Sequence, residues 1–194
     1  MNSFYTSEEL RALGLCSYGE DVLISRHARF YNPESISLGH HVRIDDFCIL
    51  SGGAGIRIGN FVHIGPYSAL YGGAGIELAD FSGISSRVAL YSESDDFSGE
   101  SLTNPMVPIA YKPGFKRGKI TVGRHAVIGT NASILPGVVL EEGAAVGAHA
   151  LVTRNCQSWS IYAGTPARRI AERSRALLAL ETQFLRTVAL PHHP

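Results

Sequence analysis

The sequence is poor in cysteine, in net charge and in long apolar runs, and each shortage excludes a class of protein. Its 194 residues include only three cysteines, Cys16, Cys48 and Cys156, and none belongs to a CxxC pair. This odd, widely spaced set does not form a disulfide framework, so we expect free thiols and a cytoplasmic location. The 17 basic and 17 acidic residues cancel, which argues against nucleic acid as a partner.

Targeting and membrane signals are also missing. The first residues, MNSFYTSEELRALG, carry charges and contain no apolar core of a signal peptide. No apolar run approaches the roughly 18 residues that a membrane-spanning helix needs. We therefore expect a protein that has no membrane partner.

The chain is instead full of short aliphatic units that often end in glycine. They recur every six or eight residues before position 91 and every six residues after position 121, which is the period of hexapeptide repeats. A small residue often follows four places later, as at Ala28, Cys48 and Ala132. The aliphatic positions are Ile24, Phe30, Leu38, Ile44, Leu50, Ile58, Ile64, Leu70, Leu78, Ile84, Leu90, Val122, Ile128, Ile134, Leu140, Val146 and Val152.

This periodicity predicts an all-β fold, a parallel β-helix over residues 18–166. Because side chains alternate along a strand, the aliphatic residue and the small residue both point inward, and the glycine region turns the corner. The extra residue pairs in SGGAGIRI and YGGAGIEL lengthen one corner and predict 20-residue coils from positions 18, 38, 58 and 78.

Both ends of such a solenoid need caps, because they would otherwise expose strand edges and core. Residues 1–17 are predicted to form an N-terminal cap, with Thr6 and Glu9 at capping-box spacing and a short helix that stops near Gly14. Residues 167–194 are predicted to form a capping helix over 167–190 and a tail. Its expected packing stripe is Ile170, Leu177, Leu180, Phe184 and Val188.

Residues 92–118 interrupt the repeat and are predicted to form one long excursion loop. The loop begins with the acidic stretch SESDDFSGE and ends with a basic one, KPGFKRGK. Long loops in compact repeat proteins are usually functional. An acidic loop attracts an amine, and the basic half, with Lys112, Lys116, Arg117 and Lys119, would attract a pyrophosphate.

Three later segments carry a resemblance to a known family. ILPGV (134–138), VGAHALVTR (146–154) and YAGTPARRI (162–170), together with the hexapeptides, resemble the left-handed β-helix acyltransferases that use acyl-coenzyme A. HVRIDDFCIL (41–50) and SSRVALYSESDDFSGESLTNP (85–105) resemble the members that acylate dTDP-4-amino-4,6-dideoxyglucose, of the viosamine and anthrose type. The left-handed coil follows from this resemblance.

The resemblance implies a coenzyme A groove between two subunits of a homotrimer, with acetyl-CoA as the acyl donor. Small residues let an extended pantetheine arm lie against the backbone, and arginines suit phosphates. Arg169 or Arg173 would supply a second contact where relatives carry an arginine at the position of Ala171. The positions that match the family's donor site are Thr130, Ala148, Thr153, Arg154 and Arg168.

The acceptor chemistry is inferred from a missing residue. Many relatives that acetylate sugar hydroxyls carry a histidine in the excursion, and residues 92–118 contain none. A hydroxyl needs a base during attack, whereas an amine of pKa roughly 8 is already partly neutral. We therefore predict transfer to the 4-amino group of a nucleotide-linked sugar. The predicted catalytic residues are Asp95 and Asp96, and the predicted substrate-binding residues are Ser85, Ser86, Glu93 and Glu100.

Three alternatives stay open at this stage. The first is that a histidine, His63, His125 or His149, is the catalytic base. The second is an O-acetyltransferase that acts on a saccharide hydroxyl. A catalytically silent β-helix scaffold would bind no coenzyme A. A zinc site would need three converging imidazoles, and the sequence shows no such spacing, so no metal is predicted.

Overall fold

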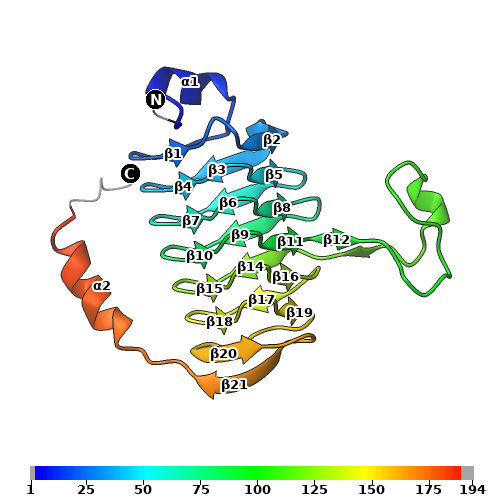
Figure 1. Ribbon diagram of the computed structural model, residues 1–194. Coiled ribbons are helices and arrows are strands. Elements are labelled where there is room, and N and C mark those ends of the chain that lie inside the picture. Colours follow the sequence, from blue (N-terminus) through cyan, green and yellow to red (C-terminus); the bar gives the residue numbers. More distant parts are fainter. Residues whose placement is uncertain (1–2, 189–194) are drawn as a thin grey trace.

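A computed structural model describes residues 3–188 and shows a solenoid of stacked coils (Figure 1). Helix α1 (Ser7–Ala12) covers the end at which the solenoid begins. An arm projects from the middle of the stack, and helix α2 (Leu177–Leu185) runs back along one side. The predicted all-β parallel β-helix is confirmed. No helix among residues 3–188 combines the length and the apolar character required to cross a bilayer.

Three sheets form the sides of the solenoid, and their strands run parallel apart from the last strand of one sheet, β21 (Arg168–Glu172). Sheet I contains β1 (Leu23–Ile24), β4 (Arg43–Ile44), β7 (His63–Ile64), β10 (Gly83–Ile84), β15 (Val127–Ile128), β18 (Ala145–Val146), β20 (Ser160–Ala163) and β21 (Arg168–Glu172). Sheet II contains β2 (Arg29–Tyr31), β5 (Ile49–Ser51), β8 (Ala69–Tyr71), β11 (Ala89–Tyr91), β16 (Ser133–Ile134) and β19 (Leu151–Val152). Sheet III contains β3 (Ile36–Leu38), β6 (Ile56–Ile58), β9 (Ile76–Leu78), β14 (Ile120–Val122) and β17 (Val139–Leu140).

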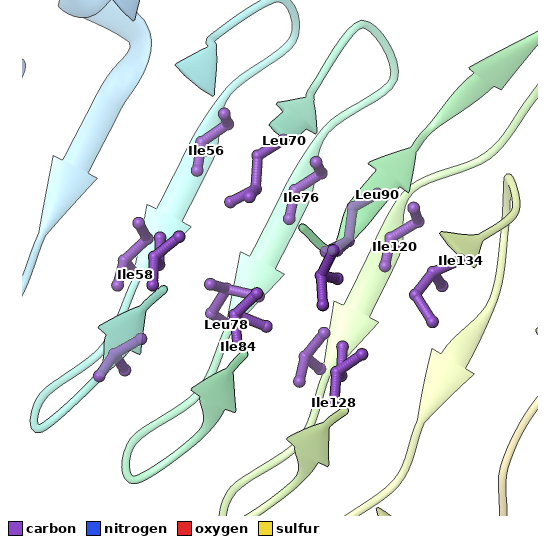
Figure 2. Close-up of a cluster of buried hydrophobic side chains, with 14 of the residues drawn as sticks. Ile56, Ile58, Leu70, Ile76, Leu78, Ile84, Leu90, Ile120, Ile128 and Ile134 are labelled. Carbon is purple, nitrogen blue, oxygen red and sulfur yellow. The ribbon is translucent and has the colours of Figure 1, made fainter. Parts of the chain in front are cut away.

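The strand register confirms the predicted coil lengths. Leu38 pairs with Ile58, which pairs with Leu78, so these coils contain 20 residues, as predicted. Beyond the arm, Val122 pairs with Leu140, and the coil contains 18 residues. The repeated aliphatic side chains are buried, apart from the partly buried Phe30, and stack in columns inside the solenoid (Figure 2).

The N-terminal cap agrees with its sequence signature. The hydroxyl of Thr6 accepts from the backbone N–H of Glu9, and the Glu9 carboxylate accepts from the backbone N–H of Thr6 at 2.7 Å. The helix ends at Ala12, and Gly14 follows with a φ of +72°. A short 3-10 helix, η1 (Pro33–Ser35), turns a corner of the first coil.

The predicted helix over 167–190 is wrong in its first ten residues. Residues Arg168–Glu172 form β21, which pairs antiparallel with β20 and covers the edge that β20 would otherwise leave open. Ladder hydrogen bonds to this edge override the helical propensity of the segment. Ile170 is 64% exposed and therefore does not belong to a packing stripe. The predicted tail and the end of the predicted helix, residues 189–194, lie outside the described residues.

Helix α2 contacts the corner between sheets III and I. Phe184 makes edge contacts with Phe61 and Phe81, at ring distances of 5.3 and 6.2 Å. Glu181 pairs with Arg124, and its Oε2 lies 3.0 Å from Nε2 of His125. Helix α2 thus contacts the solenoid through Phe184 and Glu181, but Leu180 of the expected stripe is 64% exposed.

The arm is the predicted excursion. The chain leaves sheet II after β11 as β12 (Glu93–Ser94) and returns as β13 (Lys116–Arg117), which pairs antiparallel with β12 before β14 begins. A 3-10 turn, η2 (Ile109–Tyr111), lies in its outer part. Figure 1 shows the arm standing away from the coils.

Candidate functional site

A hollow of about 760 Å³ lies at the root of the arm, and we call it the arm hollow. The arm contributes one wall, and the corner between sheets II and III contributes the other. Acidic, basic and apolar side chains all reach it, which suits a polar ligand that carries an apolar part. Its lining residues are Tyr91, Glu93, Ser94, Asp95, Phe97, Lys116, Arg117, Leu135, Pro136 and Thr153.

Asp95 is held on both carboxylate oxygens. Its Oδ1 lies 2.6 Å from Nζ of Lys112, and its Oδ2 accepts the backbone N–H of Asn104 at 2.9 Å. These partners, the Lys112 ammonium first and the Asn104 N–H second, lower the pKa of Asp95. Its side chain is 26% exposed, so an ionised carboxylate is presented to the hollow.

Asp96 and Glu100 are placed differently from Asp95. The Asp96 carboxylate accepts the backbone N–H of Ser98 at 3.1 Å and the Ser98 hydroxyl at 2.6 Å. Those same hydrogen bonds lower the pKa of Asp96. Glu100 is exposed, and its backbone N–H donates to the Ser98 hydroxyl. Both residues therefore build the turn that shapes the arm, which is ordinary Asx-turn chemistry.

Glu93 belongs to the floor of the hollow. Its Oε1 lies 2.6 Å from Nε of Arg117, across the two strands of the arm. A Cβ at Gly73 would lie 2.0 Å from the Glu93 carboxylate, so glycine at that corner is what lets the carboxylate lie against the coil.

Of the four basic residues predicted to attract a pyrophosphate, three already have acidic partners. Lys112 pairs with Asp95, Arg117 with Glu93, and Lys119 with Glu77 on sheet III. Lys116 lines the arm hollow and has no ion pair among the residues that the structure describes. It is therefore the lysine best placed to meet an anionic ligand there.

A second hollow of about 210 Å³ is lined from Val152 and Arg154 onward, and we call it the arginine hollow. Arg154, Arg168 and Arg169 reach it together, with Ala167 and the buried Cys156. Burial raises the pKa of the Cys156 thiol to about 11, so the thiol is neutral. Arg169 donates to Ser160 Oγ at 3.0 Å and pairs with Glu172 at 3.4 Å. Arg154 and Arg168 have no acidic partner in the described part of the chain.

Arg173 is not part of this hollow. Its guanidinium donates to the carbonyl oxygens of His125 at 2.7 Å and Gly143 at 3.0 Å, beneath α2. The sequence suggested Arg169 or Arg173 as a second contact to coenzyme A. Arg169 lies in the arginine hollow, whereas Arg173 holds the C-terminal segment against the coils.

The other predicted positions lie at the opposite edge of sheet II, at the corner between sheets I and II. Thr130 Oγ1 donates to the Ser86 carbonyl at 2.8 Å and lies 3.0 Å from Ser86 Oγ. Ser85 precedes Ser86 at the same corner, and Ala148 is exposed at the equivalent corner of the next coil. The structure thus separates two groups. The arm-side residues are Glu93, Asp95, Thr153, Arg154 and Arg168, and the corner-side residues are Ser85, Ser86, Thr130 and Ala148.

The histidines also differ in what they can do. His125 is 7% exposed, and its Nε2 lies 3.0 Å from Glu181, so it belongs to the α2 contact. His149 is exposed beside Asn131, at 3.4 Å. His63 is half exposed, and its Nε2 lies 2.7 Å from Asp45 Oδ2, so it forms the most base-like pair of the three. Burial raises the pKa of Asp45, but the hydrogen bonds from His63 and Arg43 outweigh it and lower that pKa.

Sequence reasoning missed several of these groups. It placed Lys112 among the phosphate-binding cations, and it gave Asp45 no role beside His63. Neither pairing leaves a signal in the sequence, because the partners lie 17 or 18 positions apart in an irregular loop or on neighbouring coils. Among residues 3–188 no group of three or more histidines, cysteines or carboxylates could hold a metal ion.

Comparison with known proteins is consistent with this geometry. The chain is 42% identical over 177 residues to the dTDP-4-amino-4,6-dideoxy-D-glucose acyltransferase of Escherichia coli, which covers 91% of this chain and 92% of the relative. A serine variant of AntD, an N-acyltransferase from Bacillus cereus, was solved with dTDP-4-amino-4,6-dideoxyglucose and coenzyme A. It is 49% identical, with a TM-score of 0.94 over 97% of this chain and 100% of that one.

AntD has also been solved with dTDP and 3-hydroxybutyryl-CoA. That structure is 49% identical and has a TM-score of 0.93 over 96% of this chain and 98% of that one. No family model matches the chain.

Proposed function

The chain belongs to the family of dTDP-4-amino-4,6-dideoxyglucose acyltransferases, and we propose that it transfers an acyl group from acyl-coenzyme A to the 4-amino group of that dTDP-linked sugar. The observation that carries this function is Asp95, an ionised carboxylate held by Lys112 and Asn104 at the wall of the arm hollow. A carboxylate in this position attracts and orients an amine.

The reaction needs little acid–base machinery from the protein. The neutral amine attacks the thioester carbonyl, the carbon–sulfur bond breaks, and coenzyme A leaves as the thiol. The proton that the amine nitrogen loses passes to solvent, to a carboxylate or to the departing thiolate. Because its pKa is lowered, Asp95 stays ionised and acts as a hydrogen-bond acceptor for the amine. A general base would need a pKa nearer to the working pH.

The two hollows suggest how the donor lies. Thr153 lines the arm hollow, and the next residue, Arg154, lines the arginine hollow. The coil of β19 lies two strand spacings, roughly 10 Å, from the coil of β11, from which the arm departs. We place the phosphates of coenzyme A at the arginines, its extended arm along this corner, and its thioester beside Asp95. Lys116 then faces the diphosphate of the nucleotide sugar.

The arm-side and corner-side residues lie at opposite edges of sheet II, and we propose that they meet between neighbouring copies of the chain. A homotrimer would bring the arm-side residues of one copy against the corner-side residues of the next. Each copy alone would then present two half-sites. The exposed Cys16 and the buried Cys48 and Cys156 are free thiols, which suits a cytoplasmic enzyme.

Arg168→Ala is expected to raise the KM for acyl-coenzyme A by roughly tenfold to a hundredfold, because a charge-assisted contact to phosphate is lost. Arg154→Ala should act in the same direction. Steady-state kinetics at saturating aminosugar measure the effect. Arg57→Ala is the matched control, since Arg57 is exposed on β6, away from both hollows. An unchanged donor KM in both arginine variants would mean that phosphates bind elsewhere.

The proposed function is tested by pairing several acyl-coenzyme A donors with nucleotide-linked 4-aminosugars and following release of the thiol. Acetyl-CoA is the donor that we expect, and 3-hydroxybutyryl-CoA is the comparison. A sugar with a hydroxyl in place of the amine separates N-acylation from O-acetylation. Absence of any shift in melting temperature with millimolar coenzyme A would favour the scaffold alternative.

A further inference from the structure

Lys112 is a buried lysine in the most exposed part of the molecule. Its side chain is 7% exposed, although Met106 and Phe97 in the same arm are 89% and 92% exposed. A lysine is almost never buried unless it is paired, because taking an ammonium out of water is unfavourable. The arm therefore encloses this charge by means of specific contacts.

Three contacts surround the ammonium. Nζ lies 2.6 Å from Asp95 Oδ1, donates to the carbonyl oxygen of Asn104 at 3.1 Å, and lies 4.4 Å from the ring centre of Phe115. The backbone N–H of Asn104 in turn donates to Asp95 Oδ2 at 2.9 Å. Asp95, Asn104 and Lys112 thus form a closed ring that ties three separate points of the arm together.

We propose that Lys112 is the positioning residue of the acceptor site, which orients the Asp95 carboxylate toward the arm hollow and keeps it charged. This inference rests on the proposed function, because it needs Asp95 to meet the sugar amine. Lys112 itself lies behind Asp95 and is not one of the residues that line the hollow.

The chemistry of the ring supports this role. An ionised carboxylate has about four lone-pair positions, and Lys112 and Asn104 occupy one on each oxygen. Because Oδ1 is fully buried against Lys112, Oδ2, which accepts one N–H from Asn104, is the oxygen with a lone pair left for the amine. Because the Lys112 ammonium is the first cause of the lowered pKa of Asp95, its removal should bring that pKa back toward the ordinary value. An Asp95 without its cation would then take up a proton more easily and lose the charge that attracts the amine.

The burial of Lys112 distinguishes its ion pair from the other two pairs near the arm root. Arg117 pairs with Glu93 and Lys119 with Glu77, and these two cations are 59% and 45% exposed. Only the Lys112 pair has its cation buried behind the carboxylate. The ion pair therefore leaves the hollow side of Asp95 open.

The test is a double-mutant cycle of Lys112→Met and Asp95→Asn. Lys112→Met is expected to lower kcat/KM for the aminosugar by roughly tenfold, with the KM for acyl-coenzyme A unchanged. In the Asp95→Asn background, adding Lys112→Met should lower kcat/KM by less than roughly a further twofold, because the effects of residues that act as one unit are not additive. Arg57→Met removes an exposed cation of β6, away from both hollows, and is the control that is expected to behave like the unsubstituted protein.

Several outcomes would overturn the proposal. Losses that multiply in the double variant would show that Lys112 acts independently of Asp95. A Lys112→Met variant with full aminosugar activity, or one that also raises the donor KM, would make Lys112 a structural residue of the arm. Carbon-13 NMR titration of the Asp95 carboxyl needs no activity: its pKa should be below the ordinary value in the unsubstituted protein and higher in Lys112→Met. If the unsubstituted protein does not acylate the aminosugar while this titration behaves as expected, the proposed function fails and the ion-pair role stands.

Discussion

The Asp95→Asn variant is expected to lower kcat/KM for the aminosugar by roughly tenfold or more and to leave the KM for acyl-coenzyme A unchanged. Asparagine keeps the shape of the side chain and can still accept from Lys112. It loses the negative charge, and its amide nitrogen cannot accept the backbone N–H of Asn104. Both changes weaken the orientation of the amine, whereas the arginine hollow is untouched.

The size of the loss separates two roles for Asp95. Loss of an orienting hydrogen bond to a charged group should lower kcat/KM about tenfold, which corresponds to about 1.4 kcal/mol. Removal of a general base usually lowers the rate by a factor of about 10² to 10⁴. Asp96→Asn is the comparison, and we expect it to lose less than roughly twofold, because the Asp96 carboxylate is occupied by Ser98. Full activity in Asp95→Asn, together with loss of activity in His63→Ala, would instead assign the chemistry to the pair of His63 and Asp45.

Ala148→Trp and Thr153→Trp are each expected to lower acyl transfer by roughly a hundredfold or more, because a bulky ring displaces the pantetheine arm from its groove. Ala148 is exposed at one edge of sheet II, and Thr153 is exposed at the other. If the groove lies between two copies, these substitutions block the same groove from opposite sides.

A mixture of the two variants distinguishes a shared site from a complete one. After unfolding and refolding together, random assembly of trimers leaves about one quarter of the interfaces with both halves intact, so about a quarter of the original activity should return. Each variant refolded alone is the control and should stay inactive. A mixture no more active than either control would mean that every copy contains its whole site.

The solenoid could be predicted from the sequence because its physics is local and repeated. The aliphatic residue of each repeat points inward, so the period alone places Ile58, Leu78 and Val122 in the core. The capping box of Thr6 and Glu9 needs only neighbours three positions apart. The strand Arg168–Glu172 could not be predicted in this way, because its partner is an open sheet edge that exists only after the coils have stacked.

The site was predictable in its residue types and less so in its pairings. Asp95, Arg154 and Arg168 lie in the two hollows, as the resemblance implies for a donor and an acceptor site. Asp96 bears the same charge as Asp95, yet it closes a turn, and only the fold of the arm distinguishes them. The burial of Lys112 likewise depends on contacts between three points of an irregular loop.

The most direct test of the account is a mass-spectrometric assay of the purified protein with acetyl-CoA and a matched pair of acceptors, dTDP-4-amino-4,6-dideoxyglucose and the same sugar with a hydroxyl at carbon 4. The account predicts an aminosugar product in which one acetyl group replaces one hydrogen, with one thiol released per product and little reaction of the hydroxyl sugar. Equal or faster acetylation of the hydroxyl sugar, or no transfer to the amine from either acetyl-CoA or 3-hydroxybutyryl-CoA, would contradict it.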